Sequence, residues 1–491
     1  CIMKRIIFFL FALFFITPSL RGQVPVQTIR GVVRDASTRE TLPNANVVLS
    51  DEGVGTITDT RGRFELNDVP VGRHTLKVSY LGYHPEMITD LVVGSGKEVV
   101  LEVELEESFS ELEEVQVTSS IRKDRPINSM ASVSARTFSV EEASRYAGAL
   151  DDPGRMAGNF AGVTTAGVNV NAIVVRGNAP KGLLWRLEGV DIPVPSHFSG
   201  ANVAGGGGLT MFSGQLLANS DFYTGAFPAE FGNAMAGVFD MKLRTGNNRQ
   251  REYAAQVGVQ GIEASAEGPF KKGGDGSFLF NYRYSTMALV FQMLPETSEG
   301  TEIPIYQDLS FKLNMPAGNA GNFSVWGIGG LSESTSQGYD NVDKWNYPEN
   351  REHMRFNYNM GAGGLTHKKG ITANTFLRTT LALNAGKHAY QEKIRLDESH
   401  PENLTPKQDV EKVEGKLTLS SLLTHKFNAR WKIKGGMDAS QMFYELHGDA
   451  RDFDAGTYAR FLEGSGDSWL LRGHAQGKYQ MTGHLSLTGG F

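Results

Sequence analysis

The sequence predicts a mainly β protein with an N-terminal β-sandwich, a mixed α/β domain and a partial transmembrane antiparallel β-barrel. Short β-type runs separated by turn signals fill residues 28–106. Helix and strand signals are mixed over residues 136–245. From residue 246 to Phe491, apolar and polar side chains alternate with a period of two almost without pause.

Residues 1–22 are expected to be a secretory signal. Met3-Lys-Arg precedes a short apolar run, and a cleavage site is expected near Gly22 or Gln23. A membrane anchor is the alternative, but the run is shorter than the ~20 residues that cross a bilayer. Cys1, upstream of Met3, is the only cysteine, so neither disulfides nor thiolate chemistry are expected after export. The net charge of −6, without a basic stripe, argues against nucleic acid as a partner.

Residues 28–106 are expected to form a small β-sandwich, because regularly spaced short strands with Gly- and Asp-containing turns are typical of that fold. The expected strands are centred on residues 32–33, 45–49, 63–66, 74–78 and 99–103. The sequences at residues 31–35, 46–49, 58–64 and 80–83 resemble those of a carboxypeptidase regulatory-like domain.

That resemblance implies an accessory module. Zinc carboxypeptidases bind their metal through a histidine and a glutamate three residues later, and none of the 11 histidines here has that neighbour. We therefore expect no enzymatic activity, no metal site and no cofactor, and a secreted peptidase is disfavoured.

Residues 107–135 are expected to be a linker, acidic first and basic later. In the next domain, Ser139 and Glu142 fit a capping box before a helix over residues 141–149. Asp152-Pro153 predicts the start of a second helix that runs to Phe160. Strands are predicted at residues 172–177 and 183–187. The glycines at 205–208 are expected to form a loop, because no Gly-Lys-Ser/Thr sequence follows to bind phosphate.

The alternation after residue 246 indicates a membrane barrel. On one predicted strand, Leu471, Ala475 and Tyr479 share a face, while Arg472 and Lys478 lie on the other. The apolar side chains at alternate positions of residues 354–362 are expected to form such a face too. We expect apolar faces to contact lipid and polar faces to line a wet or plugged lumen, with barrel closure satisfying the backbone.

Connection lengths support this interpretation, because outer-membrane barrels alternate short periplasmic turns with longer extracellular loops. Short turns are predicted at residues 316–319, 367–370, 428–430 and 482–484, and long connections at residues 292–305, 334–353, 388–413 and 446–468. A change of phase near Gly261 indicates either a tight turn or a bulge. About eleven strands are predicted; because single-chain bacterial barrels have an even number, we expect further strands beyond this sequence.

Together, the order of these parts resembles that of a TonB-dependent outer-membrane receptor with an N-terminal extension. The motif Ile173-Val-Val-Arg176-Gly177 is similar to the family's strand ending in Arg-Gly. Leu187-Glu188-Gly189-Val-Asp is similar to its Leu-Asp-Gly-Val element, with Glu188 in place of aspartate. Residues 221–233 and 236–245 match later plug motifs loosely. The resemblance implies that residues 136–245 form a plug domain inside the first half of a barrel over residues 246–491.

The resemblance also implies function: import of a scarce solute, energised by a TonB-type inner-membrane protein that pairs with a short extended box. Strand addition needs little from side chains, and the candidate box comprises Glu114, Val115, Gln116, Val117 and Thr118. A plain connector or a last sandwich strand is the alternative. Arg176 is expected to neutralise carboxylates between plug and wall.

Outer-membrane lipid is the other expected partner, and the N-terminal domain would lie in the periplasm. A surface lipoprotein encoded nearby would indicate glycan or peptide capture. The sequence does not identify the solute, and the competing hypothesis is an outer-membrane adhesion or assembly protein without import.

Overall fold

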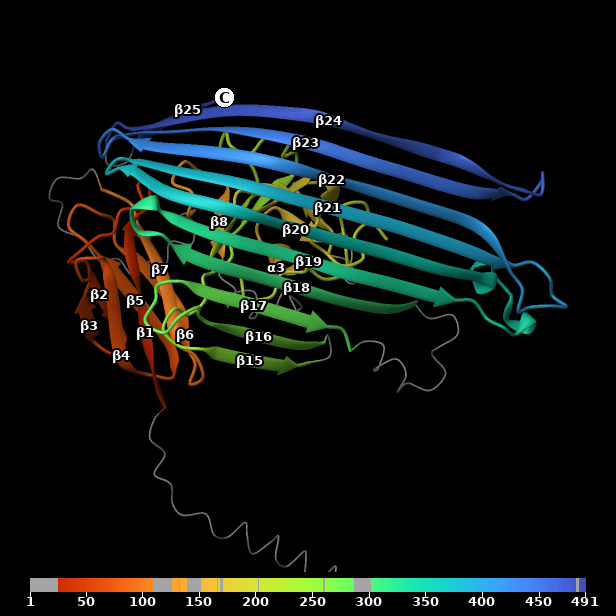
Figure 1. The fold of residues 1–491 in the computed structure, drawn as a ribbon, viewed down its shortest axis with the longest axis horizontal. Coiled ribbons are helices and arrows are strands. Elements are labelled where there is room, and N and C mark those ends of the chain that lie inside the picture. Colours follow the sequence, from red (N-terminus) through yellow and green to blue (C-terminus); the bar gives the residue numbers. More distant parts are fainter. Residues whose placement is uncertain are drawn as a thin grey trace, which may run out of the picture.

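The computed structural model describes residues 25–108, 126–131, 133–138, 152–165, 167, 171–201, 203–258, 261–286, 302–482 and 485–491. Over these residues the chain forms a small N-terminal domain, a compact central domain and one large curved sheet (Figure 1). The predicted mainly β fold is therefore confirmed. No helix in the described ranges has the length and apolar character needed to cross a bilayer.

The N-terminal domain packs a three-stranded sheet, in the order β4-β1-β7, against a four-stranded sheet, in the order β3-β2-β5-β6. Its strands are β1 (Val26–Asp35), β2 (Asn46–Leu49), β3 (Val54–Ile57), β4 (Arg63–Pro70), β5 (Gly72–Ser79), β6 (Glu86–Val93) and β7 (Val99–Leu105). Alternate residues such as Ile29, Val33, Leu76 and Val78 are buried completely between the two sheets. Sequence patterns missed β3, an exposed edge strand, and β6, which is buried only near its end.

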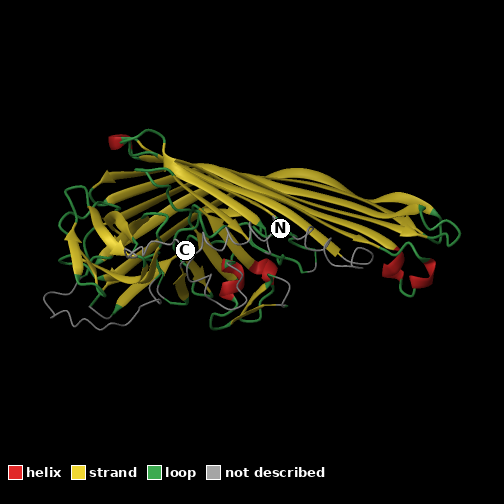
Figure 2. Cartoon of the chain, turned by 90° about the horizontal axis from the view of Figure 1, so that it is seen from below, coloured by secondary structure: helices red, strands yellow, loops and turns green. Residues whose placement is uncertain are grey.

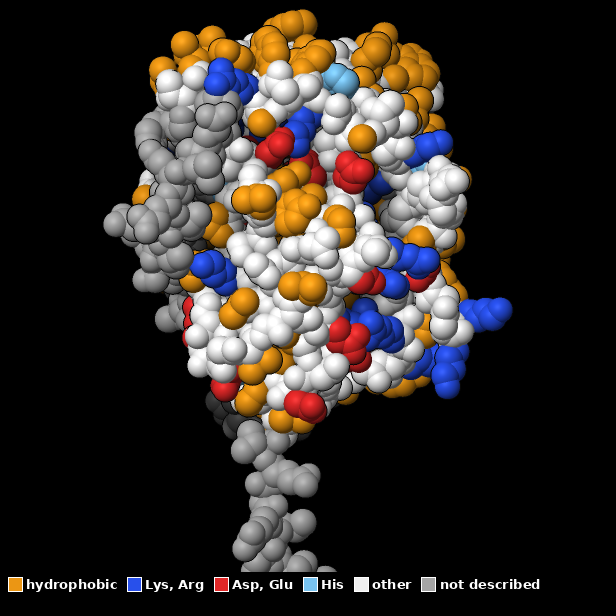
Figure 3. Space-filling model, turned by 90° about the vertical axis from the view of Figure 1, so that its left-hand side faces the viewer, with side chains coloured by type: hydrophobic (Ala, Val, Ile, Leu, Met, Phe, Trp, Pro, Cys, Tyr) orange, Lys and Arg blue, Asp and Glu red, His pale blue; other side chains and the backbone are white. Residues whose placement is uncertain are grey.

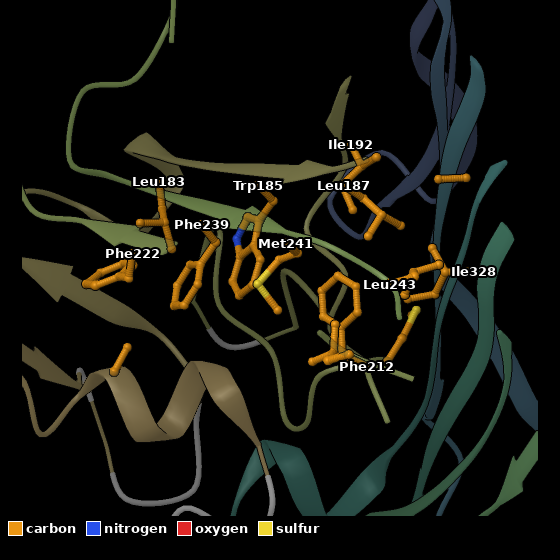
Figure 4. Packing of buried hydrophobic residues seen from close by; sticks show 14 of the residues in the cluster. Leu183, Trp185, Leu187, Ile192, Phe212, Phe222, Phe239, Met241, Leu243 and Ile328 are labelled. Carbon is orange, nitrogen blue, oxygen red and sulfur yellow. The ribbon is translucent and has the colours of Figure 1, made fainter. Parts of the chain in front are cut away.

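The central domain surrounds a five-stranded sheet, in the order β12-β11-β14-β13-β8, beside the pair β9–β10. Its elements are β8 (Ala135–Phe138), α3 (Pro153–Ala157), β9 (Val163–Thr165), β10 (Ile173–Val175), η1 (Pro180–Gly182), β11 (Leu183–Leu187), β12 (Val190–Ile192), β13 (Ser220–Tyr223) and β14 (Gly237–Met241). Trp185 and Phe239 stack at the centre of its core with ring centroids 4.3 Å apart (Figure 4).

Helix α3 begins where the sequence predicts, because the Asp152 side chain accepts hydrogen bonds from the amides of Gly154 and Arg155. Pro153 occupies the first turn, where its missing N–H is not needed. The helix ends at Ala157, shorter than predicted. The helix predicted over residues 141–149 lies outside the described residues.

The large sheet contains eleven strands in sequence order, each antiparallel to its neighbours. They are β15 (Glu252–Val257), β16 (Ile262–Pro269), β17 (Ser277–Tyr284), β18 (Glu302–Pro316), β19 (Asn322–Gln337), β20 (Glu352–Thr372), β21 (Thr375–Arg395), β22 (Leu404–Lys426), β23 (Trp431–Asp452), β24 (Thr457–Gln480) and β25 (Ser486–Gly490). The sheet arches over the central domain (Figures 1 and 2). Short connections at residues 317–321, 373–374 and 427–430 gather at one end, here called the short-turn end.

The two faces of this sheet differ as the alternation predicts. Large apolar side chains are exposed on the outer face, including Phe280, Tyr282, Leu309, Leu331, Leu365, Leu381, Leu383, Leu417, Leu419, Leu423, Met437 and Leu471. Apolar atoms crowd the upper margin of the space-filling view, where the sheet lies, and charged groups lie further inside (Figure 3). Asn281, Ser310, Thr366 and Thr418 are buried on the inner face.

Three expectations about the sheet are wrong. Residues 367–370 do not form a tight turn, because β20 continues through them and the turn to β21 lies at residues 373–374. Tyr358, Met360 and Ala362 do not form an outer apolar face; they are buried inward against the central core. Residues 388–413 and 446–468 are not long loops, because β21–β22 and β23–β24 continue as strands through most of them. At the first hairpin, Gly258 and Gly261 exchange backbone hydrogen bonds, which favours the turn over the bulge.

Candidate functional site: the ionic contact between central domain and sheet

The two sequence motifs singled out in the central domain form the same kind of turn. Arg176-Gly177 connects Val175 to Asn178, and Glu188-Gly189 connects Leu187 to Val190. All four turn residues have positive φ, from 49° at Glu188 to 89° at Gly189. A two-residue hairpin loop of type I′ requires this, which explains glycine at the second position. The turn points the Glu188 side chain at the sheet.

Glu188 forms a buried ion pair with the sheet. Lys312 on β18 donates to the Glu188 carboxylate at 2.7 Å and to the carbonyl of Leu243 at 2.6 Å. The Leu243 amide donates to the same carboxylate at 2.9 Å. Burial alone raises the pKa of Glu188, but Lys312 and Lys368 outweigh burial and lower it to about 2. Glu188 is therefore a stable anion held against the wall.

Further along the contact, central-domain acids again meet sheet bases. Glu230 pairs with Lys434 on β23 and with Arg186 of its own domain at 3.3 Å. Burial raises the pKa of Glu230, but these cations bring it well below its ordinary value. Asp191 pairs with Arg472 on β24 at 2.7 Å. In these three contacts the central domain supplies the acids and the wall supplies the bases.

Gly189 allows the wall to approach closely. A Cβ at this position would lie 2.5 Å from Nη2 of Arg378 on β21, so a side chain there would displace the guanidinium. Glycine is needed at position 189 for two reasons: the backbone has a positive φ, and the absence of a side chain leaves space for Arg378.

Arg176 does not lie in the contact with the described strands, and its expected neutralising role remains a prediction. Its side chain is exposed, and its hydrogen bond, at 3.3 Å, is to the hydroxyl of Ser134. Among the described residues it has no carboxylate partner. Arg186 instead supplies the buried positive charge of the central domain.

A second polar contact, which the sequence did not indicate, fixes the loop between β12 and β13. His197 is fully buried, and its Nε2 lies 3.0 Å from the carboxylate of Asp308 on β18. Arg283 on β17 donates to the same carboxylate at 2.8 Å. Burial lowers the pKa of His197; Asp308 opposes this effect and Arg283 reinforces it. A neutral imidazole therefore fastens the loop to the wall.

The segment before β8 is fastened to the central domain through Asp221. Its carboxylate accepts from the backbone amides of Ile127 and Asn128, each at 3.0 Å, and from Thr137 at 2.6 Å. Asn128 also donates to Glu230 at 2.8 Å. Ile127 and Asn128 are thus linked by hydrogen bonds to the central domain, and Asn128 binds the same carboxylate that pairs with Lys434.

The N-terminal domain is joined to the short-turn end of the sheet. Lys426 pairs with Asp35 at 2.6 Å and with Glu107 at 2.7 Å, and Lys432 pairs with Glu106 at 2.8 Å. A chamber of about 1640 Å³ lies between this domain, the central domain and the sheet. Glu188, Lys312, Lys368 and Arg378 are among the residues that line it.

The candidate box, Glu114 to Thr118, lies outside the described residues. The segments on either side of it are fixed, at Glu106 and Glu107 on the sheet and at Ile127 and Asn128 on the central domain. The box assignment remains a prediction.

Comparison with known proteins identifies the N-terminal domain. Residues 29–117 match the family model of the CarboxypepD_reg-like domain, so the predicted carboxypeptidase regulatory-like domain is confirmed. No curated protein matches the chain in sequence.

Solved structures resemble the rest of the chain in fold. The copper transporter OprC is 12% identical, with a TM-score of 0.50 over 74% of this chain and 54% of its own. The outer membrane transporter YddB from Escherichia coli is 11% identical, with a TM-score of 0.48 over 73% of this chain and 56% of its own. The chain thus spans about half the length of these proteins. The resemblance to TonB-dependent outer-membrane receptors is confirmed as a resemblance of fold.

Proposed function

We propose that the chain belongs to an outer-membrane receptor that imports a scarce solute through a plugged barrel, energised by a TonB-type inner-membrane protein. The observation that supports this most is the charge-paired contact between acids of the central domain and bases of the facing wall. The central domain would be the plug, and the large sheet part of the barrel wall.

A polar contact suits a plug that must move. Separating two apolar surfaces exposes both to water, at about 25 cal/mol per Å². Burying charged groups such as Glu188 and Lys312 costs a large desolvation free energy. When the two groups separate and are hydrated again, the hydration free energy that they regain offsets the loss of their attraction. A plug held by such pairs stays in place at rest and can still be displaced by force.

The force would enter at the box, residues 114–118. An extended box pairs with a partner strand through backbone hydrogen bonds. The pull would reach the plug through Ile127 and Asn128, whose amides bind Asp221. Because Asn128 also binds Glu230, the pull would act on the pair between Glu230 and Lys434.

The proposed location is the outer membrane, with lipid against the exposed apolar face of the sheet. Outer-membrane barrels place their short turns in the periplasm. The N-terminal domain is joined to the short-turn end, so the proposal places it in the periplasm as well. We propose no catalytic role for any of these residues.

The test uses a cysteine on the inner face of the sheet. Ser440 on β23 is 2% exposed and faces inward, and no other cysteine follows Cys1 within residues 1–491. With any cysteine elsewhere in the full-length protein replaced by serine, Ser440→Cys provides a single internal thiol. Whole cells expressing the full-length protein are treated with a thiol reagent, with and without an uncoupler. Energised cells should label this thiol, and both the uncoupler and deletion of residues 114–118 should abolish the labelling.

Ser399→Cys, at an exposed position between β21 and β22, is the matched control and should be labelled under every condition. Labelling of Ser440→Cys that is the same in energised, uncoupled and deleted cells would refute energised import. That result would favour the competing function, an adhesion or assembly protein whose plug does not move.

A further inference from the structure

From β18 to β24, the inner face of the sheet carries an excess of positive charge toward the short-turn end, whereas β15 and β16 carry the buried acids Glu252 and Glu267. In the halves of β18 to β24 nearest that end, the described strand residues facing inward include nine bases and one acid. The bases are Lys312, Lys368, Arg378, Lys416, Lys426, Lys432, Lys434, Arg472 and Lys478, and the acid is Asp438. Each base contacts the central domain or the N-terminal domain, or lies beside one of their acids.

Most of the acidic side chains that pair with these bases belong to the central domain and the N-terminal domain, which are the parts that would move. Glu188, Asp191 and Glu230 belong to the central domain, and Asp35 and Glu106 belong to the N-terminal domain. On the wall itself, Asp438 pairs with Arg472 at 3.1 Å. If the plug and the N-terminal domain withdrew, the wall would keep its bases and lose its counter-charges.

Three of the bases make no direct hydrogen bond to a plug carboxylate among the residues described. Lys368 lies 3.9 Å from Glu188, and Lys416 lies 3.8 Å from Asp191, both beyond hydrogen-bond distance. Arg378 has no ion-pair partner within 4.0 Å among the residues described. Direct hydrogen bonding to the plug acids therefore does not involve all of the wall bases.

We propose that the solute carried through this barrel is anionic, with carboxylate, phosphate or sulfate groups that the basic wall attracts when the plug is displaced. The proposal rests on the import function proposed above and adds the substrate class. Rings of Lys and Arg give pores their preference for anions. Charges in a low-dielectric channel also raise the local concentration of the oppositely charged ion.

The experiment compares two thiol reagents of similar size and opposite charge on full-length Ser440→Cys protein in energised cells. The anionic probe is 2-sulfonatoethyl methanethiosulfonate, and the cationic probe is the 2-(trimethylammonium)ethyl analogue. Each labelling rate is divided by the rate of the same reagent with a small free thiol, which removes intrinsic reactivity. The normalised rate should favour the anionic probe about tenfold.

Charge-removing variants identify the source of the preference. Lys368→Gln, Arg378→Gln and Lys416→Gln, combined, should bring the ratio of the two rates close to one. Lys416→Arg, which keeps the charge, should leave it unchanged. Ser420→Cys on β22, another buried inward position, provides a second reporter if Ser440→Cys does not assemble.

The outcomes separate this proposal from the one on which it rests. Energised labelling with equal rates, or with faster cationic labelling, would overturn the anionic substrate class and leave import intact. A preference that the triple Gln variant retains would also overturn it, because the named bases would not be its cause. If neither probe labels more in energised than in uncoupled cells, import itself fails and this inference with it.

Discussion

Lys426 and Asp35 are 391 residues apart in the sequence, and their side chains form a hydrogen bond of 2.6 Å that joins the N-terminal domain to the large sheet. Asp35 is buried, and it also accepts from the amides of Ser37 and Thr38. The carboxylate therefore orders its own loop and anchors the domain. Two predictions depend on this contact.

Removing the cation should loosen the domain without disturbing its internal structure. The reporter is the Glu98 amide, which donates to Glu252 of β15 at 3.0 Å. Lys426→Gln should raise hydrogen exchange at Glu98 roughly tenfold, because a hydrogen bond to a charged group contributes about 1.5 kcal/mol or more. Lys387→Gln breaks an exposed pair with Glu411 and should change nothing. Unchanged exchange in Lys426→Gln would show that the pair does not hold the domain.

The same contact should resist mild acid. Burial raises the pKa of Asp35, but the hydrogen bonds from Lys426 and from Thr38 outweigh it, and the net pKa is lowered. A carboxyl with a depressed folded pKa stabilises above its unfolded value, about 3.9, and loses that effect as the pH falls through the folded value. The protection factor at the Thr38 amide, which donates to the Asp35 carboxylate itself at 2.8 Å, should be constant from pH 7 to 5 and should fall only below about pH 4. A fall already at pH 6 would contradict this assignment.

In the pair between Glu188 and Lys312, removing one charge should destabilise the plug more than removing both charges. Glu188→Gln leaves the ammonium of Lys312 buried without its anion, which should destabilise the plug by about 3 kcal/mol or more. Replacing both residues with methionine should restore most of that loss, because no buried charge is left unpaired. Calorimetry of the plug transition in detergent measures both effects. A double variant no more stable than Glu188→Gln would show that the pair has no such coupling.

The sequence predicts much of this architecture because alternation reports which side of a strand meets water or a polar surface. It places Leu471 outside and Arg472 inside, as the structure does. It misplaces Tyr358 and Met360, because an apolar side chain gives the same signal whether it meets lipid or a plug core. Whether an apolar face contacts lipid or the plug depends on what packs opposite that strand. The sequence of a single strand does not contain this information.

The site was predicted only in part for a similar reason. Glu188-Gly189 could be found because a two-residue turn is a local feature. Lys312 is 124 residues further along the chain, and its meeting with Glu188 depends on how the plug sits against the register of β18. His197, between Ser196 and Phe198 in an irregular loop, has no periodicity around it. Its role appears only once Asp308 lies beside it.

The aromatic stack at the centre of the plug should dominate its stability. Trp185 and Phe239 are almost parallel, at 9°, and Phe239 is fully buried (Figure 4). Phe239→Ala should lower the stability of the plug by about 3–5 kcal/mol, from lost burial and a residual cavity. Phe239→Leu should cost much less, because it fills most of that volume. Similar losses in the two variants would mean that the core closes around the smaller side chain.

Acidification should release the loop that His197 holds. Burial depresses the pKa of His197, so its stabilising effect is complete above the unfolded value of about 6.5 and declines as the pH falls below it. The Phe198 amide, which donates to Ser332 of β19 at 3.2 Å, reports the contact. Its protection factor, corrected for intrinsic exchange, should drop several-fold between pH 7.5 and 5.5. In His197→Gln, which cannot take up a proton, protection should no longer depend on pH over this range. His400→Gln, at an exposed histidine, should keep the wild-type pH dependence. A pH dependence that survives in His197→Gln would assign the effect to another group.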